Sequence, residues 1–480
     1  MDTRQTELIA AVAERFGGKA AITDRDAIAP WERDWRGRYS GHSAAVLAPA
    51  TAGEAAAIIG LARQAGVAVV PQGGNTSMVG GATPPADGSA LILTTRRMNR
   101  VRSIDADAGL AVVEAGVILS DLHGAVADAG LRFPLTLGAK GSATIGGLVS
   151  TNAGGTQVLR WGTMRGLVAG LEAVLPDGSI HDGLAPLKKD NRGYDINQLL
   201  VGAEGTLGLV TAATLRLVPE VRARAAAWVG LASPHAALAL LRRLEAATDA
   251  VESFELLPAA SLAAVLRHIP GTRAPVAGES AWHVLIEAVA SRADDAEPAD
   301  VLGDALQGAG GLIEQATLSA SDAQIEAFWR IRDSISEAER ADGPAAQHDI
   351  SVPVAAMPDF LIDAAAAVKA RFPGTNASGF GHLGDGNVHF HVRAPAGAVA
   401  AHWYANAAPA ITRFVNDLVV AAGGSISAEH GIGQMKLGEL ERLSSPARMA
   451  VLRGVKAAFD PGELFNPGKL VTLARPGATP

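Results

Sequence analysis

Two short segments in the second half of the chain bring together residue types that bind metals and transfer protons. His382 and His389 lie on either side of a Gly-Asp-Gly turn, and Glu429 stands next to His430 between small residues. A strand that folds back through the turn would bring His382 close to His389. Two imidazoles and one carboxylate form a familiar ligand set for a divalent cation, with positions left open for a substrate. For any one of these histidines alone, a buried structural imidazole is the more common role.

A third segment, Phe328–Ser336, offers a cation. If this segment is helical, Arg332 and Ser336 are four residues apart and lie on one face. A guanidinium at that place can bind a carboxylate through two parallel hydrogen bonds. An isolated arginine on a helix is more often simply solvated, so this segment does not establish a binding site by itself.

Composition limits the chemistry. The 480 residues, 48% of them hydrophobic, supply a large core and favour at least two domains. A net charge of -8, with no run of Lys and Arg, argues against a nucleic-acid partner. The chain has no cysteine, which excludes disulfides, thiolate metal sites and a cysteinyl bond to a cofactor. Any metal ligands must therefore be histidine and carboxylate.

The N-terminus predicts an amphipathic helix and not a targeting segment. Charges occur at Asp2, Arg4 and Glu7, and apolar residues recur at helical spacing from Leu8 to Phe16. No stretch approaches the roughly 18 uncharged apolar residues needed to span a bilayer. We expect a cytoplasmic protein that is at most peripheral to a membrane.

Short apolar strands alternate with glycine-rich turns from Ser43 to Pro219, beginning in the order strand, helix, strand, loop. The pair Asp177-Gly178 suits a tight primed turn within a hairpin. After Arg222 the helices become longer and richer in Ala and Leu, which favours a domain boundary near 220. The final segment FDPGELFNPGKLV predicts a C-terminal tail that packs against the rest of the protein.

Two glycine-rich loops in the first half are suited to a phosphate ligand. Residues 70–77, VPQGGNTS, follow a strand, so successive backbone N–H groups could bind a pyrophosphate. Residues 134–155 supply many hydroxyl and amide donors without bulky side chains. Neither loop is a Walker or a Rossmann motif. For either loop alone, glycine and asparagine that only serve tight turns are an equally good explanation.

Taken together, these segments resemble a known family. PQGGNTS, LGAKGSATIGG, TNAGG, KKDNRGYDINQLLVGAEGTLG and FNPGK resemble the FAD-binding half of the vanillyl-alcohol-oxidase-type flavoproteins, in the branch of D-lactate and D-2-hydroxyglutarate dehydrogenases. GHLGDGNVH and SAEHGIG match the same branch, and the resemblance covers nearly the whole chain. It implies an α+β fold with a PCMH-type, non-Rossmann FAD-binding domain of two α+β subdomains over 1–222. A substrate-binding or cap domain with an antiparallel sheet would follow over 223–430, and a C-terminal segment over 431–480 would return to the FAD domain.

The resemblance also implies FAD as the cofactor. Relatives that attach FAD covalently use His or Cys, but this chain has no Cys and neither loop contains His, so we expect noncovalent FAD. The residues expected to bind it are Pro71, Gln72, Gly73, Gly74, Asn75, Thr76, Ser77, Pro134, Gly138, Ser142, Thr144, Gly146, Gly147, Thr151, Asn152, Gly154 and Asn466.

By the same resemblance, His382, His389 and Glu429 hold a divalent metal, which is Zn by family likeness, although Mn and Fe accept such ligands. These three residues also border the substrate, whose carboxylate Arg332 binds with help from Ser336. His430 is the expected catalytic base. His391 is expected either to support the ligands from behind or to be structural.

The implied reaction is the oxidation of a D-2-hydroxy acid to the 2-oxo acid, with the hydroxyl proton passing to His430 and hydride passing to flavin N5. The electrons would leave to electron-transferring flavoprotein or a quinone. Relatives commonly carry Lys where this chain has Gln347, which weakens the case for a dicarboxylate such as D-2-hydroxyglutarate and favours a monocarboxylate such as D-lactate.

Two other functions remain open. One is a flavoprotein transferase of the alkyl-glycerone-phosphate-synthase type, and the other is a noncatalytic FAD-binding subunit of a glycolate-oxidase-like complex. The sequence leaves the oligomeric state undecided, with a homodimer as one option.

Overall fold

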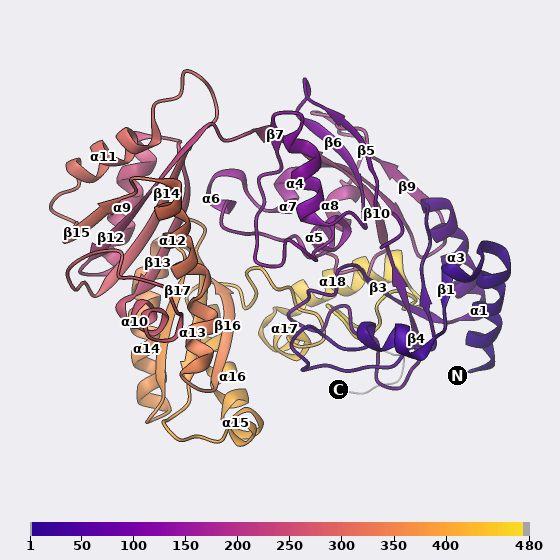
Figure 1. The fold of residues 1–480 in the computed structure, drawn as a ribbon. Helices are drawn as coiled ribbons and strands as arrows, with labels where there is room; N and C mark the ends of the chain where they lie inside the picture. Colours follow the sequence, from indigo (N-terminus) through magenta and orange to yellow (C-terminus); the bar gives the residue numbers. More distant parts are fainter. Residues whose placement is uncertain (1, 474–480) are drawn as a thin grey trace. The chain divides into compact units, whose positions relative to one another are not determined.

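The computed structural model describes residues 2–473, and it divides into two compact units (Figure 1). Unit 1 contains the residues up to Gly154, Gly162–Pro219 and the residues from Glu429 onward. Unit 2 contains Gly155–Trp161 and Glu220–Ala428. Unit 2 therefore includes a short segment, Gly155–Trp161, that the sequence-based division assigned to the first domain.

The first subdomain of unit 1 is built on a four-stranded sheet in the order β1-β2-β4-β3. Its elements are α1 (Thr3–Phe16), η1 (Gly18–Ala20), β1 (Ala21–Ile22), α2 (Arg25–Ile28), η2 (Ala29–Trp31), β2 (Val46–Leu47), α3 (Ala52–Ala65), β3 (Ala68–Gln72) and β4 (Ala90–Thr94).

The order strand, helix, strand, loop predicted from the sequence is confirmed, because β2 and β3 both pair in parallel with β4 and α3 connects them. The α3 helix begins after Thr51, whose hydroxyl accepts the N–H of Glu54, and ends at Gly66 in the left-handed conformation. The predicted amphipathic helix is α1, which buries the apolar face from Leu8 to Val12.

The second subdomain of unit 1 is a five-stranded antiparallel sheet in the order β5-β6-β10-β8-β9, with short helices around it. Its elements are β5 (Val101–Asp105), β6 (Leu110–Glu114), α4 (Leu119–Ala127), β7 (Leu131–Arg132), α5 (Ile145–Thr151), α7 (Met164–Leu167), β8 (Val168–Val174), β9 (Ile180–Gly183), α8 (Ile196–Leu200), β10 (Leu209–Arg216) and β11 (Val218–Pro219).

The β8–β9 hairpin was predicted correctly, but the prediction of its turn type was wrong. Both primed turns require a positive φ at Asp177, whereas only Gly178 has one, at 87°. The N–H of Leu175 donates to Ser179 O and the N–H of Gly178 donates to Leu175 O, so the loop is wider than two residues. The Oδ1 of Asp177 instead accepts the N–H of Ser179. This hydrogen bond stabilises the turn without a left-handed residue at position 177.

The C-terminal part of unit 1 contains α17 (Leu437–Leu443), α18 (Pro446–Phe459) and a tail that docks as predicted. The N–H of Asn466 donates to Val69 O of β3, and Phe465 has no exposed surface. The buried Lys456 amine donates to Asp460 at 2.6 Å and to Phe465 O at 3.0 Å. The C-terminal segment therefore belongs to the same core as the first subdomain.

Unit 2 is a seven-stranded antiparallel sheet in the order β15-β12-β14-β13-β17-β18-β16, with helices on both faces (Figure 1). Its elements are α6 (Val158–Trp161), β12 (Ala223–Leu231), α9 (Pro234–Ala247), β13 (Val251–Pro258), α10 (Ala259–His268), β14 (Trp282–Ala290), α11 (Pro298–Gly308), β15 (Gln315–Leu318), α12 (Asp322–Asp333), α13 (Ile335–Ala341), β16 (Ala345–Ser351), η3 (Val354–Ala356), α14 (Met357–Arg371), β17 (Asn376–His382), β18 (Asn387–Arg393), α15 (Ala400–His402), η4 (Trp403–Ala407, a π-helical turn) and α16 (Ala408–Ala421).

The two faces of this sheet differ in character. One face packs its apolar side chains, such as Leu256, Val388 and Phe390, against α9, α11, α14 and α16. The other face is covered in part by α10, α12 and α13, whose apolar residues form a separate cluster with Trp228 and Phe380. Because successive side chains alternate along a strand, polar residues of β13, β16, β17 and β18 gather on this second face.

The segment predicted to carry Arg332 and Ser336 on one helix is interrupted. The α12 helix ends at Asp333, Ser334 lies between the two helices with φ -82° and ψ -4°, and α13 begins at Ile335. Arg332 and Ser336 therefore belong to two consecutive helices. No helix among the described residues is long and apolar enough to cross a membrane.

Candidate active site

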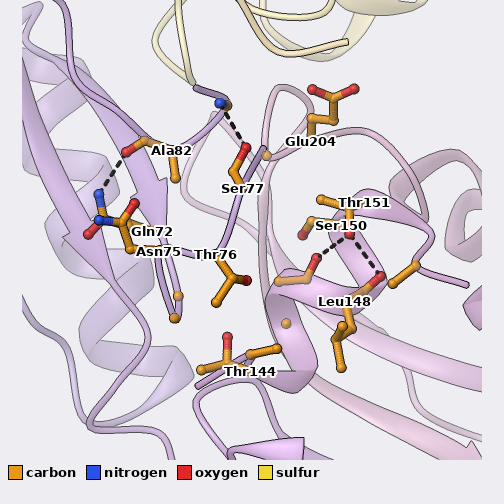
Figure 2. Close-up of a pocket in the computed structure, with 18 of the residues that line it drawn as sticks. Gln72, Asn75, Thr76, Ser77, Ala82, Thr144, Leu148, Ser150, Thr151 and Glu204 are labelled. Carbon is orange, nitrogen blue, oxygen red and sulfur yellow. Dashed lines mark hydrogen bonds between the residues drawn. The ribbon is translucent and has the colours of Figure 1, made fainter. Parts of the chain in front are cut away.

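A cavity of about 330 Å³ lies in unit 1 between the two glycine-rich loops (Figure 2). This volume lies within the range of small-molecule and cofactor pockets. The residues predicted to bind FAD that line it are Pro71, Gln72, Gly73, Gly74, Asn75, Thr76, Ser77, Gly138, Thr144, Gly146, Gly147, Thr151 and Gly154. The folding of the chain thus brings the two loops to one place.

Pro134 and Ser142, also predicted to bind FAD, are not among the residues that line the cavity. Pro134 is buried at the start of the second loop. Ser142 lies behind the first loop, where a Cβ atom at Gly74 would come within 1.9 Å of the Ser142 carbonyl oxygen. Only glycine at position 74 permits the two loops to approach this closely.

The other two predicted residues that do not line the cavity are Asn152 and Asn466. Their side chains form hydrogen bonds that stabilise the cavity walls. Asn152 has a left-handed backbone at the end of α5, and its Oδ1 accepts the N–H of Arg165. The Nδ2 of Asn466 donates to the carbonyl oxygens of Gly81, at 2.9 Å, and Glu204, at 2.8 Å. Asn466 therefore connects the C-terminal tail to two loops of the cavity.

The cavity wall fits a ligand with many polar atoms. Gln72 Oε1, Thr95 Oγ1 and Thr144 Oγ1 are buried without a hydrogen-bond partner among the described residues. The Nε2 of Gln72 is already used, because it donates to Trp31 O and Ala82 O. Buried polar atoms are rarely left unpaired, so these three oxygens favour a bound molecule such as FAD.

The lining residues described by the structure include no lysine or arginine. Any phosphate groups in the cavity would therefore be bound by backbone N–H groups and hydroxyls, as expected of the VPQGGNTS loop. Figure 2 shows Thr76 and Thr144 facing each other across the cavity.

Three acidic or basic side chains also line the cavity: Glu204, Glu429 and His430. Glu429 and His430 were predicted as a metal ligand and a base, whereas Glu204 was missed. Its surrounding sequence, Gly-Ala-Glu-Gly, indicates a tight turn, but nothing in the pattern shows that the carboxylate turns inward. In Figure 2 the Glu204 carboxylate points toward the C-terminal segment of the chain, drawn in pale yellow.

In unit 2, a carboxylate that the sequence did not reveal, Glu255 on β13, organises the polar sheet face. Its side chain has no exposed surface. Its Oε2 accepts the Nε of Arg332 at 2.6 Å, and its Oε1 pairs with Nδ1 of His382 at 2.5 Å. Burial alone would raise the pKa of the Glu255 carboxyl, but the charges of Arg332 and His382 outweigh it and hold that pKa at about 2.

His382 and His389 lie together, as predicted from the turn between them. Their ring centroids are 5.7 Å apart, and strands β17 and β18 form the expected hairpin. Burial holds the pKa of His389 well below its usual range, so its imidazole is neutral near pH 7. A neutral imidazole is the form that binds a metal.

Asp349 and Asn387 stand beside this pair. Asp349 Oδ1 is 3.9 Å from Nδ1 of His389 and accepts Nδ2 of Asn387 at 2.9 Å. The Oδ1 of Asn387 is buried without a partner among the described residues. Two neighbouring imidazoles, one of them oriented by Glu255, and polar surroundings make this part of unit 2 suitable for a divalent cation.

Arg332 projects from the end of α12, where only 8% of the residue is exposed. Its guanidinium lies over the ring of Phe380, with 5.3 Å to the centroid. Among the residues that the structure describes, no acceptor binds its Nη1 or Nη2. Glu255 thus orients the guanidinium through Nε and leaves two donors for an anionic ligand.

His391 and Gln347 continue the same sheet face. They are directly paired across β16 and β18, and the buried Glu339 carboxylate of α13 pairs with Nδ1 of His391. The hydroxyl of Ser261 also donates to Glu339. His391 has a buried partner, consistent with the structural role expected from the sequence.

Family models match both halves of the chain. Residues 43–183 match an FAD binding domain, and residues 220–470 match the C-terminal domain of FAD linked oxidases. The chain is 38% identical over 467 residues to a mitochondrial D-2-hydroxyglutarate dehydrogenase of Bos taurus, which covers 96% of this chain and 83% of the relative.

Two solved structures share the fold. p-Cresol methylhydroxylase with substrate bound has a TM-score of 0.73 at 13% identity, covering 98% of each chain. Alkyldihydroxyacetonephosphate synthase has a TM-score of 0.69 at 16% identity, covering 96% of this chain and 84% of the other. These neighbours confirm the α+β, PCMH-type fold expected from the sequence. By its matches along the whole length, the chain belongs to the FAD-linked oxidases of the vanillyl-alcohol-oxidase type, in the branch of the D-2-hydroxyglutarate dehydrogenases, and is an FAD-dependent oxidoreductase.

Proposed function

We propose that this enzyme oxidises a D-2-hydroxy acid to the 2-oxo acid with the help of a bound divalent metal. The observation that carries the proposal is Glu255, which binds Arg332 with one oxygen and His382 with the other. A 2-hydroxy acid carries its hydroxyl on the carbon next to its carboxylate. The protein groups that bind the hydroxyl and the carboxylate must therefore lie close together. One buried carboxylate fixes a guanidinium and an imidazole at such a spacing.

Each residue has a separate role in this proposal. The Nη groups of Arg332 hold the substrate carboxylate, and Ser336 assists. His430 accepts the hydroxyl proton while hydride leaves C2, and the product carries a new carbon–oxygen double bond. When bound, FAD supplies the acceptor for that hydride at N5. When bound, a metal ion supplies the Lewis acidity that lowers the pKa of the 2-hydroxyl group.

The proposed metal ligands are His382, His389 and Glu429. Glu255 supports His382 in this role, because a carboxylate on Nδ1 fixes the tautomer that presents Nε2 to a metal. The neutral state of His389 supports its role as the second ligand, because a metal binds the neutral imidazole. Glu429 and the choice of Zn come from the sequence resemblance alone.

The choice of substrate and acceptor is also part of the proposal. D-2-Hydroxyglutarate is the substrate named for the mitochondrial relative, and D-lactate is the substrate favoured by Gln347. We expect electron-transferring flavoprotein or a quinone to take the electrons. The cytoplasmic location and the homodimer stay predictions. The transferase and the noncatalytic subunit are less well supported, because neither requires that Arg332 and His382 pair with the same carboxylate.

The first test is an anaerobic titration of the flavin-loaded protein with D-lactate, L-lactate, D-2-hydroxyglutarate and glycolate, before and after treatment with a chelator. We expect a D-acid to bleach the flavin absorbance, and we expect the chelator to abolish bleaching and to remove about one equivalent of metal. Bleaching that survives complete metal removal would contradict the metal site. Absence of bleaching by any of these acids would contradict the dehydrogenase proposal and favour the transferase or the noncatalytic subunit.

The substitution His430→Ala should lower the rate of flavin reduction by about 100-fold or more, because loss of a general base typically costs ~100- to 10,000-fold. FAD content should not change. Stopped-flow absorbance at saturating substrate measures the rate, and His402→Ala, a change at an exposed histidine of α15, is the control. A variant that reduces its flavin at the normal rate would remove His430 as the base.

The substitution Glu255→Gln should weaken metal binding by about 10- to 100-fold, the usual effect of losing the partner of a metal-bound histidine. The amide nitrogen of glutamine would face Nδ1 of His382 and favour the tautomer whose Nε2 carries a proton. Metal competition with a chromophoric chelator gives the affinity. Glu287→Gln is a matched control on the same face of neighbouring β14, where Trp329 donates to the carboxylate. Equal affinities in both variants would argue against Glu255 as the support of a metal ligand.

The substitution Gln347→Lys should raise kcat/KM for D-2-hydroxyglutarate relative to D-lactate by roughly 10-fold or more. A hydrogen bond to a charged group contributes about 1.5–3 kcal/mol, and lysine offers one to a second carboxylate. Steady-state kinetics with a dye acceptor measure the ratio. Gln347→Met, which keeps the size without the charge, should leave the preference for the dicarboxylate no higher than in the parent enzyme. An unchanged ratio in the lysine variant would show that position 347 does not contact the substrate side chain.

A further inference from the structure

Glu204 is a carboxylate in the cavity wall of unit 1 that has no part in the proposed chemistry. It lies in the loop between α8 and β10, and burial raises the pKa of its carboxyl group despite the hydrogen bonds that it accepts. Glu204 is half-buried, and removing a carboxylate from water is costly unless its oxygens bind donors. The donors of Glu204 come from one short segment of the chain.

That segment immediately follows His430. Glu204 Oε1 accepts the N–H of Ile432 at 2.7 Å, and Oε2 accepts the N–H of Gly433, also at 2.7 Å. Gly431 and Gly433 both have left-handed backbones, with φ values of 80° and 51°. Successive N–H groups in such a conformation form a concave anion site, and here the anion is a side chain of the same unit.

The carboxylate also determines what can stand at position 431. A Cβ atom there would lie 2.8 Å from Glu204 Oε1, so the segment after His430 closes tightly around the carboxylate. The next residues are fixed as well, because the N–H groups of Gln434 and Met435 both donate to Val79 O, just after the first glycine-rich loop. His430 therefore enters the cavity from a segment that is bound at several successive residues.

The backbone of Glu204 is held from two other sides. Its N–H donates to Ser150 O of α5 at 2.7 Å, and its carbonyl oxygen accepts Asn466 Nδ2 at 2.8 Å. Glu204 also has a left-handed φ of 51°, which is unfavourable for a residue with a side chain and persists where surrounding contacts enforce it. One residue thus connects the second glycine-rich loop, the C-terminal tail and the segment that carries His430.

We infer that Glu204 is the positioning residue for His430: its carboxylate holds residues 431–433 so that the imidazole is presented to the FAD cavity in the geometry needed for proton transfer. The inference rests on the proposed role of His430 as the base. It assigns Glu204 no contact with substrate. A glutamine at this position keeps one acceptor oxygen but places an NH₂ group against the second backbone N–H, so the segment can no longer be held by both donors.

The test compares Glu204→Gln with the parent enzyme, both loaded with FAD. We expect flavin reduction at saturating substrate to slow by about 10- to 100-fold, because displacing a catalytic group by about 1 Å costs up to ~100-fold. The FAD dissociation constant and the flavin absorbance spectrum should stay within about twofold of the parent values. Glu463→Gln is the matched control, since Glu463 also has a left-handed backbone, at φ 50°, and its carboxylate also accepts a backbone N–H. This control should reduce its flavin at the parent rate.

A double-mutant cycle separates positioning from a general structural effect. If Glu204 acts through His430, the variant with both Glu204→Gln and His430→Ala should be no slower than His430→Ala alone. Multiplying effects would overturn the inference, and so would a normal rate in Glu204→Gln when His430→Ala is slow. If His430→Ala itself reduces flavin normally, the proposed base is wrong, and that outcome is distinguishable from a failure of Glu204 alone.

Discussion

A fully buried carboxylate is the constraint on which the polar face of unit 2 depends. Removing Glu255 from water carries a large desolvation cost, and such a group persists as an anion only where it is closely paired and hydrogen-bonded. Arg332 and His382 meet that requirement, one at each oxygen. This shared pairing has two consequences for Arg332 and His382. Two groups that would otherwise sample many rotamers are fixed by the same anion, and the spacing between them is set by the width of one carboxylate.

In unit 1 the carboxylate of Glu204 is also withdrawn from water, but its partners differ from those of Glu255. The carboxylate of Glu204 is held by two backbone N–H groups, from residues 432 and 433, and the charge of Lys436 also acts on it. The pKa of Glu204 is raised because burial outweighs the two backbone N–H groups and the charge of Lys436, whereas the pKa of Glu255 is lowered because Arg332 and His382 outweigh burial. In each unit a carboxylate outside the proposed chemistry contacts residues to which we assign a part in it.

The sequence predicted the local elements well and the contacts between distant segments poorly. Periodicity indicated α1, α3 and the β17–β18 hairpin, and the glycine-rich loops marked the cavity. Glu255 could not be recognised, because it lies in an apolar strand, VESFELLP, and acquires its partners only when β13 pairs with β17 and α12 packs over the sheet. Glu204 was missed for a similar reason. The break at Ser334 and the wider hairpin turn at Gly178 depend on backbone angles that residue types allow but do not determine.

The charges on the polar face of unit 2 bear on which substrate side chain fits the proposed reaction. On this sheet face Arg332 already pairs with Glu255, and His391 already pairs with Glu339. A monocarboxylate adds one negative charge, which the remaining donors of Arg332 can bind, whereas a dicarboxylate adds a second that requires another cation. Gln347, paired directly with His391 on this sheet face, is neutral and supplies no such cation.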